Sequence, residues 1–205
     1  MFADIVVKKG LNLSLVGQSA HKILNPKLSK NFSIYPADFH GVFPKLVVKE
    51  NDTVKAGDVL FYDKNSEKVN FCSPVSGRVE EIVRGERRVV LEIKIISDEK
   101  ENYKKLSSVK SKKPADIIEF LSRSGLMPFI KQRPYDIIAN PDILPSHIYI
   151  SGFDSSPLAA DYEYCLKDQL ENIQTAIDYI SLLTHGETFV TLKKGNSNVF
   201  IDLKL

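Results

Sequence analysis

Residues 45 to 96 alternate short apolar runs with residues that tolerate turn geometry. Asn51-Asp52 and Ala56-Gly57-Asp58 are turn formers, and β-branched or aromatic residues dominate Val59–Phe61 and Val69–Phe71. Short runs bounded by such residues are typical of strands joined by tight connections. The pattern therefore predicts a small all-β module in this part of the chain.

The second half of this module has the same organisation. We expect a strand over Val79–Val83, which Arg84-Gly85-Glu86 folds back onto Arg87–Ile96. A turn at His40–Pro44 leads into a first strand over Lys45–Lys49. Together these strands predict a barrel-like sandwich that resembles lipoyl and biotinyl carrier domains.

Carrier domains hold their acceptor lysine at the tip of a central hairpin, which here is Asp63–Lys68. Lys64 and Lys68 lie in this stretch, but neither has the neighbours that a lipoyl or biotinyl ligase recognises. We interpret both as solvated charges, which discourage mispairing of an exposed hairpin. A modified carrier lysine is the competing interpretation.

Apolar periodicity stops after the module. Ser97–Lys113 is rich in lysines with interspersed acidic residues, which predicts a solvated linker, and docking on anionic lipid is the alternative. Pro114 at a first helical position, apolar residues at helical spacing over 117–121 and Gly125 as a stop predict a short amphipathic helix.

The last third of the chain predicts a βαβ unit. His147–Ser151 alternates like a strand, and Thr188–Leu192 is again rich in strand formers. Between them we expect one long helix that ends at His185-Gly186 and has an apolar face formed by Leu166, Leu170, Ile173, Ile177 and Ile180. Two strands joined in this way pair in parallel with a right-handed crossover. A further strand is expected over Val199–Leu205, with the natural architecture continuing past it.

Composition narrows the class of protein. The apolar fraction of 43% suits a globular core, and a formal net charge of +2 offers no field to attract nucleic acid. No run of about 18 apolar residues occurs in the sequence, so we expect no membrane span. The N-terminal stretch Phe2–Lys8 predicts a strand that packs on the β-module.

Residues that usually bind metals are scattered along the chain. Cys72 and Cys165 lack a CxxC context, and the four histidines share no metal-ligand spacing. We interpret the cysteines as reduced core residues and expect no metal site. A glycine-rich phosphate loop and a GxSxG nucleophile motif are also missing from the sequence, so we expect neither nucleotide binding nor hydrolase chemistry.

The loop that follows the predicted strand His147–Ser151 is the expected ligand-facing edge. In open α/β sheets, ligands bind at the carboxyl ends of the strands. The candidate contact residues are Gly152, Phe153, Asp154, Pro157 and Leu158. Asp154 would repel a phosphate. The alternative is that Asp154, with the two serines after it, caps the segment begun by Pro157.

Four segments read together resemble the A subunit of the sodium-translocating NADH:quinone reductase. They are DIVVKKGLNLSLVG at Asp4–Gly17, DFHGVFPKLVVKENDTVKAGDVLFYDK at Asp38–Lys64, FCSPVSGRVEEIVRGERRVV at Phe71–Val90, and the stretch His147–Gly186 that opens with HIYISGFDSSP. They cover most of the chain in the order found in the family. The combination of the KKGLNL start with an unmodified lipoyl-like module is more specific than any single segment.

The resemblance implies a peripheral subunit on the cytoplasmic face of the bacterial inner membrane, in contact with the membrane through the other subunits of the complex. That complex would oxidise NADH, reduce ubiquinone and export sodium ions, and this subunit would be associated with quinone binding. FAD, FMN, riboflavin, the 2Fe-2S cluster and ubiquinone would lie on or between other subunits. The resemblance therefore implies no cofactor bound by this chain, no catalytic residue and no complete active site.

The implied fold class is α+β or α/β, a lipoyl-like barrel-sandwich β module followed by a partial Rossmann-like βαβ region. We expect an N-terminal strand segment over 1–37, the module without acceptor lysine over 38–97, a charged linker over 98–113 and the α/β region over 114–205. Because family members are longer, we expect an N-terminal fragment. Two alternatives stay open: a subunit of a related ferredoxin:NAD electron-transport complex, and a non-catalytic carrier-like docking module.

Overall fold

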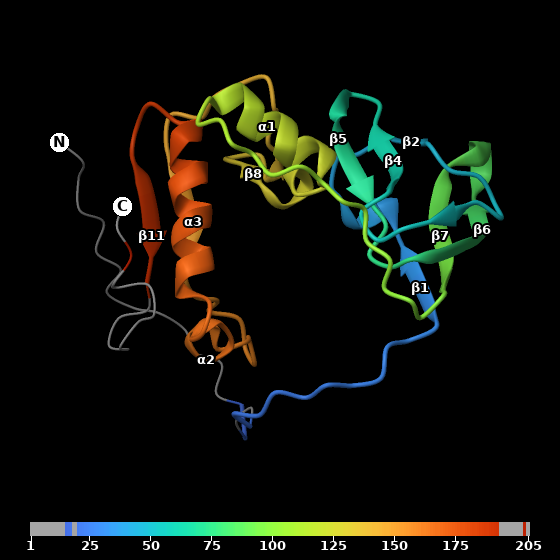
Figure 1. Ribbon diagram of the computed structural model, residues 1–205, viewed down its shortest axis with the longest axis horizontal. Helices are drawn as coiled ribbons and strands as arrows, with labels where there is room; N and C mark the ends of the chain where they lie inside the picture. Colours follow the sequence, from blue (N-terminus) through green and yellow to red (C-terminus); the bar gives the residue numbers. More distant parts are fainter. Residues whose placement is uncertain (1–14, 18–19, 193–202, 204–205) are drawn as a thin grey trace.

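The computed structural model describes residues 15–17, 20–192 and 203. Figure 1 shows a β-module at one end of the molecule, helix α3 with strand β11 at the other, and helix α1 between them. The strands predicted over Phe2–Lys8 and Val199–Leu205 lie outside the described residues, apart from Leu203 alone.

The β-module is a sandwich of two antiparallel sheets, which confirms the predicted fold. One sheet has the order β1-β7-β6-β3 and consists of β1 (Asn31–Ile34), β7 (Val90–Ser97), β6 (Gly77–Arg84) and β3 (Thr53–Val54). The other has the order β2-β4-β5 and consists of β2 (Pro44–Leu46), β4 (Val59–Asp63) and β5 (Ser66–Cys72). Inward side chains from both sheets form one core, which includes Leu60, Phe61, Val79, Ile93 and Ile95.

Strand boundaries differ from the prediction at three places. The strand expected over Arg87–Ile96 begins at Val90, because Arg87 and Arg88 adopt positive φ angles in the preceding turn (η2, Glu86–Arg88). The strand expected over Lys45–Lys49 is confined to Pro44–Leu46. Asn31–Ile34, within the N-terminal segment, pairs with β7 and so forms an edge strand of the first sheet, followed by the turn η1 (Pro36–Asp38).

The predicted linker binds to the module along its first part. The buried Ser76 donates its hydroxyl to Asp98 Oδ1 (2.6 Å) and accepts from the N–H of Asn102 (3.0 Å). Ala56 then donates to the carbonyl of Asn102 (2.9 Å) and accepts from the N–H of Lys104 (2.8 Å). Residues 98–105 are nevertheless all exposed, so these hydrogen bonds attach a solvent-exposed segment to the module.

Helix α1 (Pro114–Arg123) forms as predicted, with Pro114 in its first turn. Gly125 ends it at a φ of 73°, and a Cβ at this position would lie 2.8 Å from the Cys72 sulfur of β5. The short turn η3 (Met127–Phe129) follows, and Met127 belongs to the core of the β-module. The chain then makes a small hairpin of β8 (Lys131–Gln132) and β9 (Ile137–Ile138).

The βαβ unit is confirmed, because β10 (Ile148–Ser151) and β11 (Thr188–Thr191) pair in parallel. The prediction of a single long helix between these two strands is wrong. The structure has α2 (Tyr162–Leu166), α3 (Leu170–Ile180) and the turn η4 (Ser181–Leu183). Gln169 leaves the helical conformation (φ −115°, ψ 14°), and its N–H closes a turn on the carbonyl of Leu166 (2.9 Å).

The two faces of β5 have different roles. Val69 and Phe71 are buried in the core of the module. Because successive side chains of a strand point to opposite faces, Lys68, Asn70 and Cys72 share the outward face. This outward face contacts the region after the linker, so the module and α1 are held together by the strand that forms one arm of the carrier-like hairpin.

Candidate functional site

The carrier-like hairpin is tied down at its tip and on its outward face. Asp63 Oδ1 accepts hydrogen bonds from the N–H groups of Phe43 (3.0 Å) and Asn65 (3.1 Å). Lys68 pairs with Asp142, which precedes β10, although both side chains stay more than half exposed. Lys64 is exposed at the turn itself. A swinging cofactor arm requires a lysine that is free to move, and of the two hairpin lysines Lys68 forms an ion pair whereas Lys64 is exposed.

The five residues predicted to face a ligand lie in the loop that follows β10. Gly152 is buried and donates its N–H to the carbonyl of Thr191 on β11 (2.9 Å). Phe153 is half-buried, whereas Pro157 is exposed. Leu158 is 69% exposed and has a φ of 60°. The loop therefore presents its apolar residues 157 and 158 outward from the carboxyl end of the strand.

The polar groups of this loop bind one another. Asp154 Oδ1 accepts from the N–H of Ser156 (2.8 Å), and the Ser151 hydroxyl donates to the carbonyl of Phe153 (2.7 Å). Hydrogen bonds from the side chain and backbone of Ser156 lower the pKa of the Asp154 carboxyl, so it is charged at neutral pH. The alternative interpretation of Asp154 as a cap therefore holds for this turn only. The helix that follows, α2, is capped by Asp161. A negative loop of this kind suits an uncharged ligand better than an anionic one.

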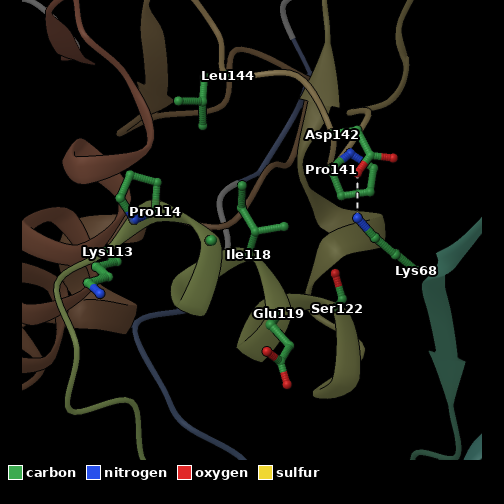
Figure 2. A pocket seen from close by; sticks show the side chains of 10 residues that line it. Lys68, Lys113, Pro114, Ile118, Glu119, Ser122, Pro141, Asp142 and Leu144 are labelled. Atoms are coloured by element: carbon green, nitrogen blue, oxygen red, sulfur yellow. Dashed lines mark hydrogen bonds and ion pairs between the residues drawn. The ribbon is translucent and has the colours of Figure 1, made fainter.

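A groove along α1 is a second candidate, which no sequence pattern predicted (Figure 2). Its volume is about 750 Å³. Its apolar lining residues are Pro114, Ala115, Ile118, Pro141 and Leu144, and its polar ones are Lys68, Lys113, Glu119, Ser122 and Asp142. Mostly apolar clefts with a few polar groups are the usual form of small-molecule sites. The lining residues come from three segments that are far apart in sequence, so no local sequence pattern predicts the groove.

Ser122 is the most unusual residue of the groove. It is only 5% exposed, and its hydroxyl has no hydrogen-bond partner among the described residues. Its backbone carbonyl accepts from the side-chain amide of Asn70 (3.1 Å), which fixes this part of α1 against β5. In Figure 2 its hydroxyl oxygen points toward the side on which Lys68 and Asp142 meet. A buried hydroxyl without a partner costs about 1–3 kcal/mol, which a ligand oxygen would recover.

Metal ligands and membrane spans can be assessed over the same part of the chain. Over residues 15–17, 20–192 and 203, no group of three or more His, Cys, Asp or Glu is arranged to hold a metal ion. Over those residues, too, the structure has no helix with the length and apolar character to cross a membrane.

The two cysteines do not share one environment. Cys72 is half-buried, and burial raises the pKa of its thiol. Cys165 is exposed, which contradicts its interpretation as a core residue. The reason is that α2 is a short helix on which none of the residues is buried.

Two family models match the chain in succession. The NqrA N-terminal barrel-sandwich hybrid domain matches residues 5–98, and the NqrA second alpha/beta domain matches residues 112–204. These descriptions agree with the sandwich and with the α/β region of the structure. The β-module and the βαβ unit therefore correspond to two known domains of one family.

Three curated relatives are each named as the A subunit of the Na(+)-translocating NADH-quinone reductase. The protein from Marinomonas sp. (strain MWYL1) is 35% identical over 92% of this chain and 43% of its own length. Those from Saccharophagus degradans and Actinobacillus pleuropneumoniae serotype 5b are 32% and 33% identical over 94% and 95% of this chain, and 44% of each relative. This chain thus spans less than half the length of these relatives. With both domains matched in order, the chain belongs to the NqrA family, the A subunits of the Na(+)-translocating NADH-quinone reductases.

Proposed function

We propose that the chain acts as a peripheral subunit of a complex that oxidises NADH, reduces ubiquinone and exports sodium ions. The observation that carries this proposal is the match of two successive domains to NqrA, together with relatives named for that complex. The partners are then the other subunits of the complex. The chain works on the cytoplasmic face of the bacterial inner membrane and reaches the membrane through those partners.

Within the complex, this subunit supports the reaction and carries out no redox step alone. FAD, FMN, riboflavin and the 2Fe-2S cluster lie on or between the other subunits. The reaction belongs to the translocase class, because electron transfer from NADH to ubiquinone drives sodium export. The Lys68–Asp142 ion pair supports this role over that of a carrier, since it fixes a lysine of the carrier-like hairpin.

Quinone association is the finer part of the proposal. The loop residues Gly152, Phe153, Asp154, Pro157 and Leu158 contact the quinone. Two observations support this: the loop follows the carboxyl end of β10, where α/β sheets bind ligands, and Pro157 with Leu158 offers exposed apolar surface.

The test is photo-crosslinking of a photoreactive ubiquinone analogue to the whole complex, followed by peptide mapping. We expect label on this subunit within residues 129–205, and excess ubiquinone should suppress it. Label confined to membrane-spanning subunits would contradict quinone association. A complex with Phe153→Ala and Asp154→Asn should show a raised KM for quinone, whereas Ser155→Ala in the same exposed loop should not.

A carrier-like docking module is the second candidate, because Lys64 is exposed at the hairpin turn. The intact mass of the chain isolated from its natural source decides between the two functions. A mass equal to that of the unmodified polypeptide rules out the carrier, and an added lipoyl or biotinyl group would establish it. Membership of a ferredoxin:NAD electron-transport complex is a further alternative, which co-purification of the partner subunits would resolve.

A further inference from the structure

We propose that residues 22–29, which precede β1, are a docking strand for another polypeptide, one that offers an unpaired sheet edge with acidic side chains beside it. The inference rests on the proposed function for the partner, which is then another subunit of the same complex. It assigns an interaction surface to a part of the chain that belongs neither to the groove along α1 nor to the loop after β10.

The docking strand is held at both ends. Before it, the His21 ring packs on the ring of Tyr164 in α2, with centroids 4.8 Å apart. After it, the carbonyl of Lys30 accepts from the N–H of Ser97 (2.8 Å), and the Lys30 ammonium lies 3.4 Å from Glu99 Oε1. Figure 1 shows the segment as a blue trace from the neighbourhood of α2 to β1. Because only the residues between two fixed ends have to be ordered, docking loses less conformational entropy.

The apolar side chains of the docking strand are uncovered. Every residue from 20 to 30 is exposed. The exposed fractions of Ile23, Leu24 and Leu28 are 65%, 69% and 58%. A single exposed aliphatic side chain is ordinary on a protein surface, whereas several close together are typical of an interaction site. These three side chains therefore favour a partner that buries them.

The backbone of the same residues is unpaired as well. Within the described part of the chain, no group forms a hydrogen bond with the N–H or C=O groups of residues 23–28. Open backbone groups of this kind are a template to which another strand can add. Pro26 has no N–H, and a strand that contains proline keeps the edge with that residue toward solvent. The opposite edge, with the N–H groups of Ile23, Asn25 and Lys27, is the one that pairs.

Charge selects an acidic partner. Residues 5–37 contain five lysines and no aspartate or glutamate. Lys30 pairs with Glu99, whereas Lys22 and Lys27 form no ion pair with any residue that the structure describes. Docking of two copies of this chain strand to strand would bring these lysines opposite one another, which destabilises a pair of strands. An edge strand of a different polypeptide, with Asp or Glu beside it, matches both lysines.

An anionic lipid surface offers the same charge and an apolar interior, but it suits the docking strand less well. Inside a bilayer, backbone N–H and C=O groups need partners within the protein, and helices or closed barrels supply them. The side chains of Leu24 and Leu28 could not enter lipid without taking unpaired backbone groups with them. A sheet edge accommodates the aliphatic side chains and pairs the backbone, so a protein partner is favoured.

Site-specific photo-crosslinking in the whole complex tests the docking strand. The photoreactive residue p-benzoylphenylalanine replaces Leu24, the complex is purified through this subunit, and the irradiated product is mapped by mass spectrometry. We expect a crosslink to one strand of another subunit, with Asp or Glu beside it. The same photoreactive residue at Val47 is the matched control, because Val47 is 56% exposed but its N–H already donates to the carbonyl of Leu60 (2.9 Å). It should give no crosslink to that strand.

Asn25→Pro separates strand pairing from side-chain contact. It removes one N–H from the pairing edge, and the lost hydrogen bond should lower the crosslink yield from position 24 by about 3- to 10-fold. Asn25→Ala keeps the N–H and is the matched control. Because Asn25 is exposed, neither variant should change the melting temperature. Lys22→Glu combined with Lys27→Glu should also lower the yield, and high salt should reduce the difference from the unchanged chain.

Four results would overturn the inference. They are no crosslink from position 24, a crosslink to lipid alone, a crosslink to a second copy of this chain or to another part of the same polypeptide, and equal yields from Asn25→Pro and Asn25→Ala. Co-purification of the other subunits tests the proposed function separately. A chain that assembles with them but gives no crosslink contradicts this inference alone, and a chain that assembles with none of them contradicts both.

Discussion

The β-module and the region that follows it are held together in different ways. Both sheets of the module surround one core, in which Phe61 and Ile93 are fully buried. The first part of the following region, α1 with η3, joins that same core through Met127, whereas Ile177 of α3 is buried apart from it. The domain boundary in the sequence therefore does not separate two structurally independent units. The region of α1 is held both by the outward face of β5 and by the core of the module.

The largest effect should come from the core of the module itself. Phe61→Ala removes a side chain that is 0% exposed and stacks on Phe71 with ring centroids 4.4 Å apart. We expect a loss of about 3–5 kcal/mol in the free energy of unfolding, measured by urea denaturation. Phe43→Ala, at a side chain that is 60% exposed, should cost under about 0.5 kcal/mol. Equal effects would mean that the module core is not built as described.

Gly125→Ala should have the next largest effect, and it acts where α1 meets β5. A φ of 73° costs a residue with a side chain about 1–2 kcal/mol, and the new Cβ would lie 2.8 Å from Cys72 Sγ. Hydrogen exchange should show faster exchange in α1 than in β6 or β7. Cys72→Ala in the same chain should recover the part due to the contact. Uniform exchange across both regions would contradict a close contact between Gly125 and Cys72 of β5.

Asn70→Ala tests the hydrogen bond from β5 to the carbonyl of Ser122 (3.1 Å). We expect a loss of about 1 kcal/mol, because the carbonyl it leaves is partly buried. Asn65→Ala at the hairpin tip is the matched control, since Asn65 is exposed and bonds through its backbone N–H. Urea denaturation of both variants measures the difference, and a cost at Asn65 equal to that at Asn70 would contradict the role of β5 in holding α1.

The smallest effect concerns Glu92, on the outer surface of the module. Hydrogen bonds from the hydroxyls of Ser33 (2.6 Å) and Tyr35 (3.0 Å) lower its pKa below the ordinary value of 4.5. Its contribution to stability is therefore complete above that value and is lost as pH falls through the lower pKa of the folded state. Stability measured from pH 6 to 3 should fall less steeply in Glu92→Gln than in Glu80→Gln. Parallel curves would contradict this contribution.

Local sequence patterns predicted much of the fold. The features that they did not predict depend on contacts between segments that are distant in sequence. Turn residues such as Gly85, and the pair Pro114 and Gly125 around α1, act on their own neighbours, so their patterns could be interpreted directly. The hydrogen bond between Asn102 and Ala56 depends on two segments that are distant in sequence and lie side by side in the fold. No period or spacing encodes such a match.

The same distinction applies to the candidate site. The loop after β10 could be predicted because its place follows from the order of strand and helix. The groove could not, because Ser122 looks like any helical serine until Asn70, Pro141 and Asp142 are seen around it. The structure adds those neighbours, and it shows that the buried Ser122 hydroxyl has no hydrogen-bond partner among the described residues.

The carrier-like module contacts the region of α1 through Asn70 and Cys72 of β5, so we expect the module and α1 to move as one body. Backbone ¹⁵N relaxation on the full chain can compare rotational correlation times from amides of β6 and β7 with those of α1. We expect one shared correlation time for these elements. Two distinct times, with the module tumbling faster than α1, would contradict the attachment and return the hairpin to a carrier role.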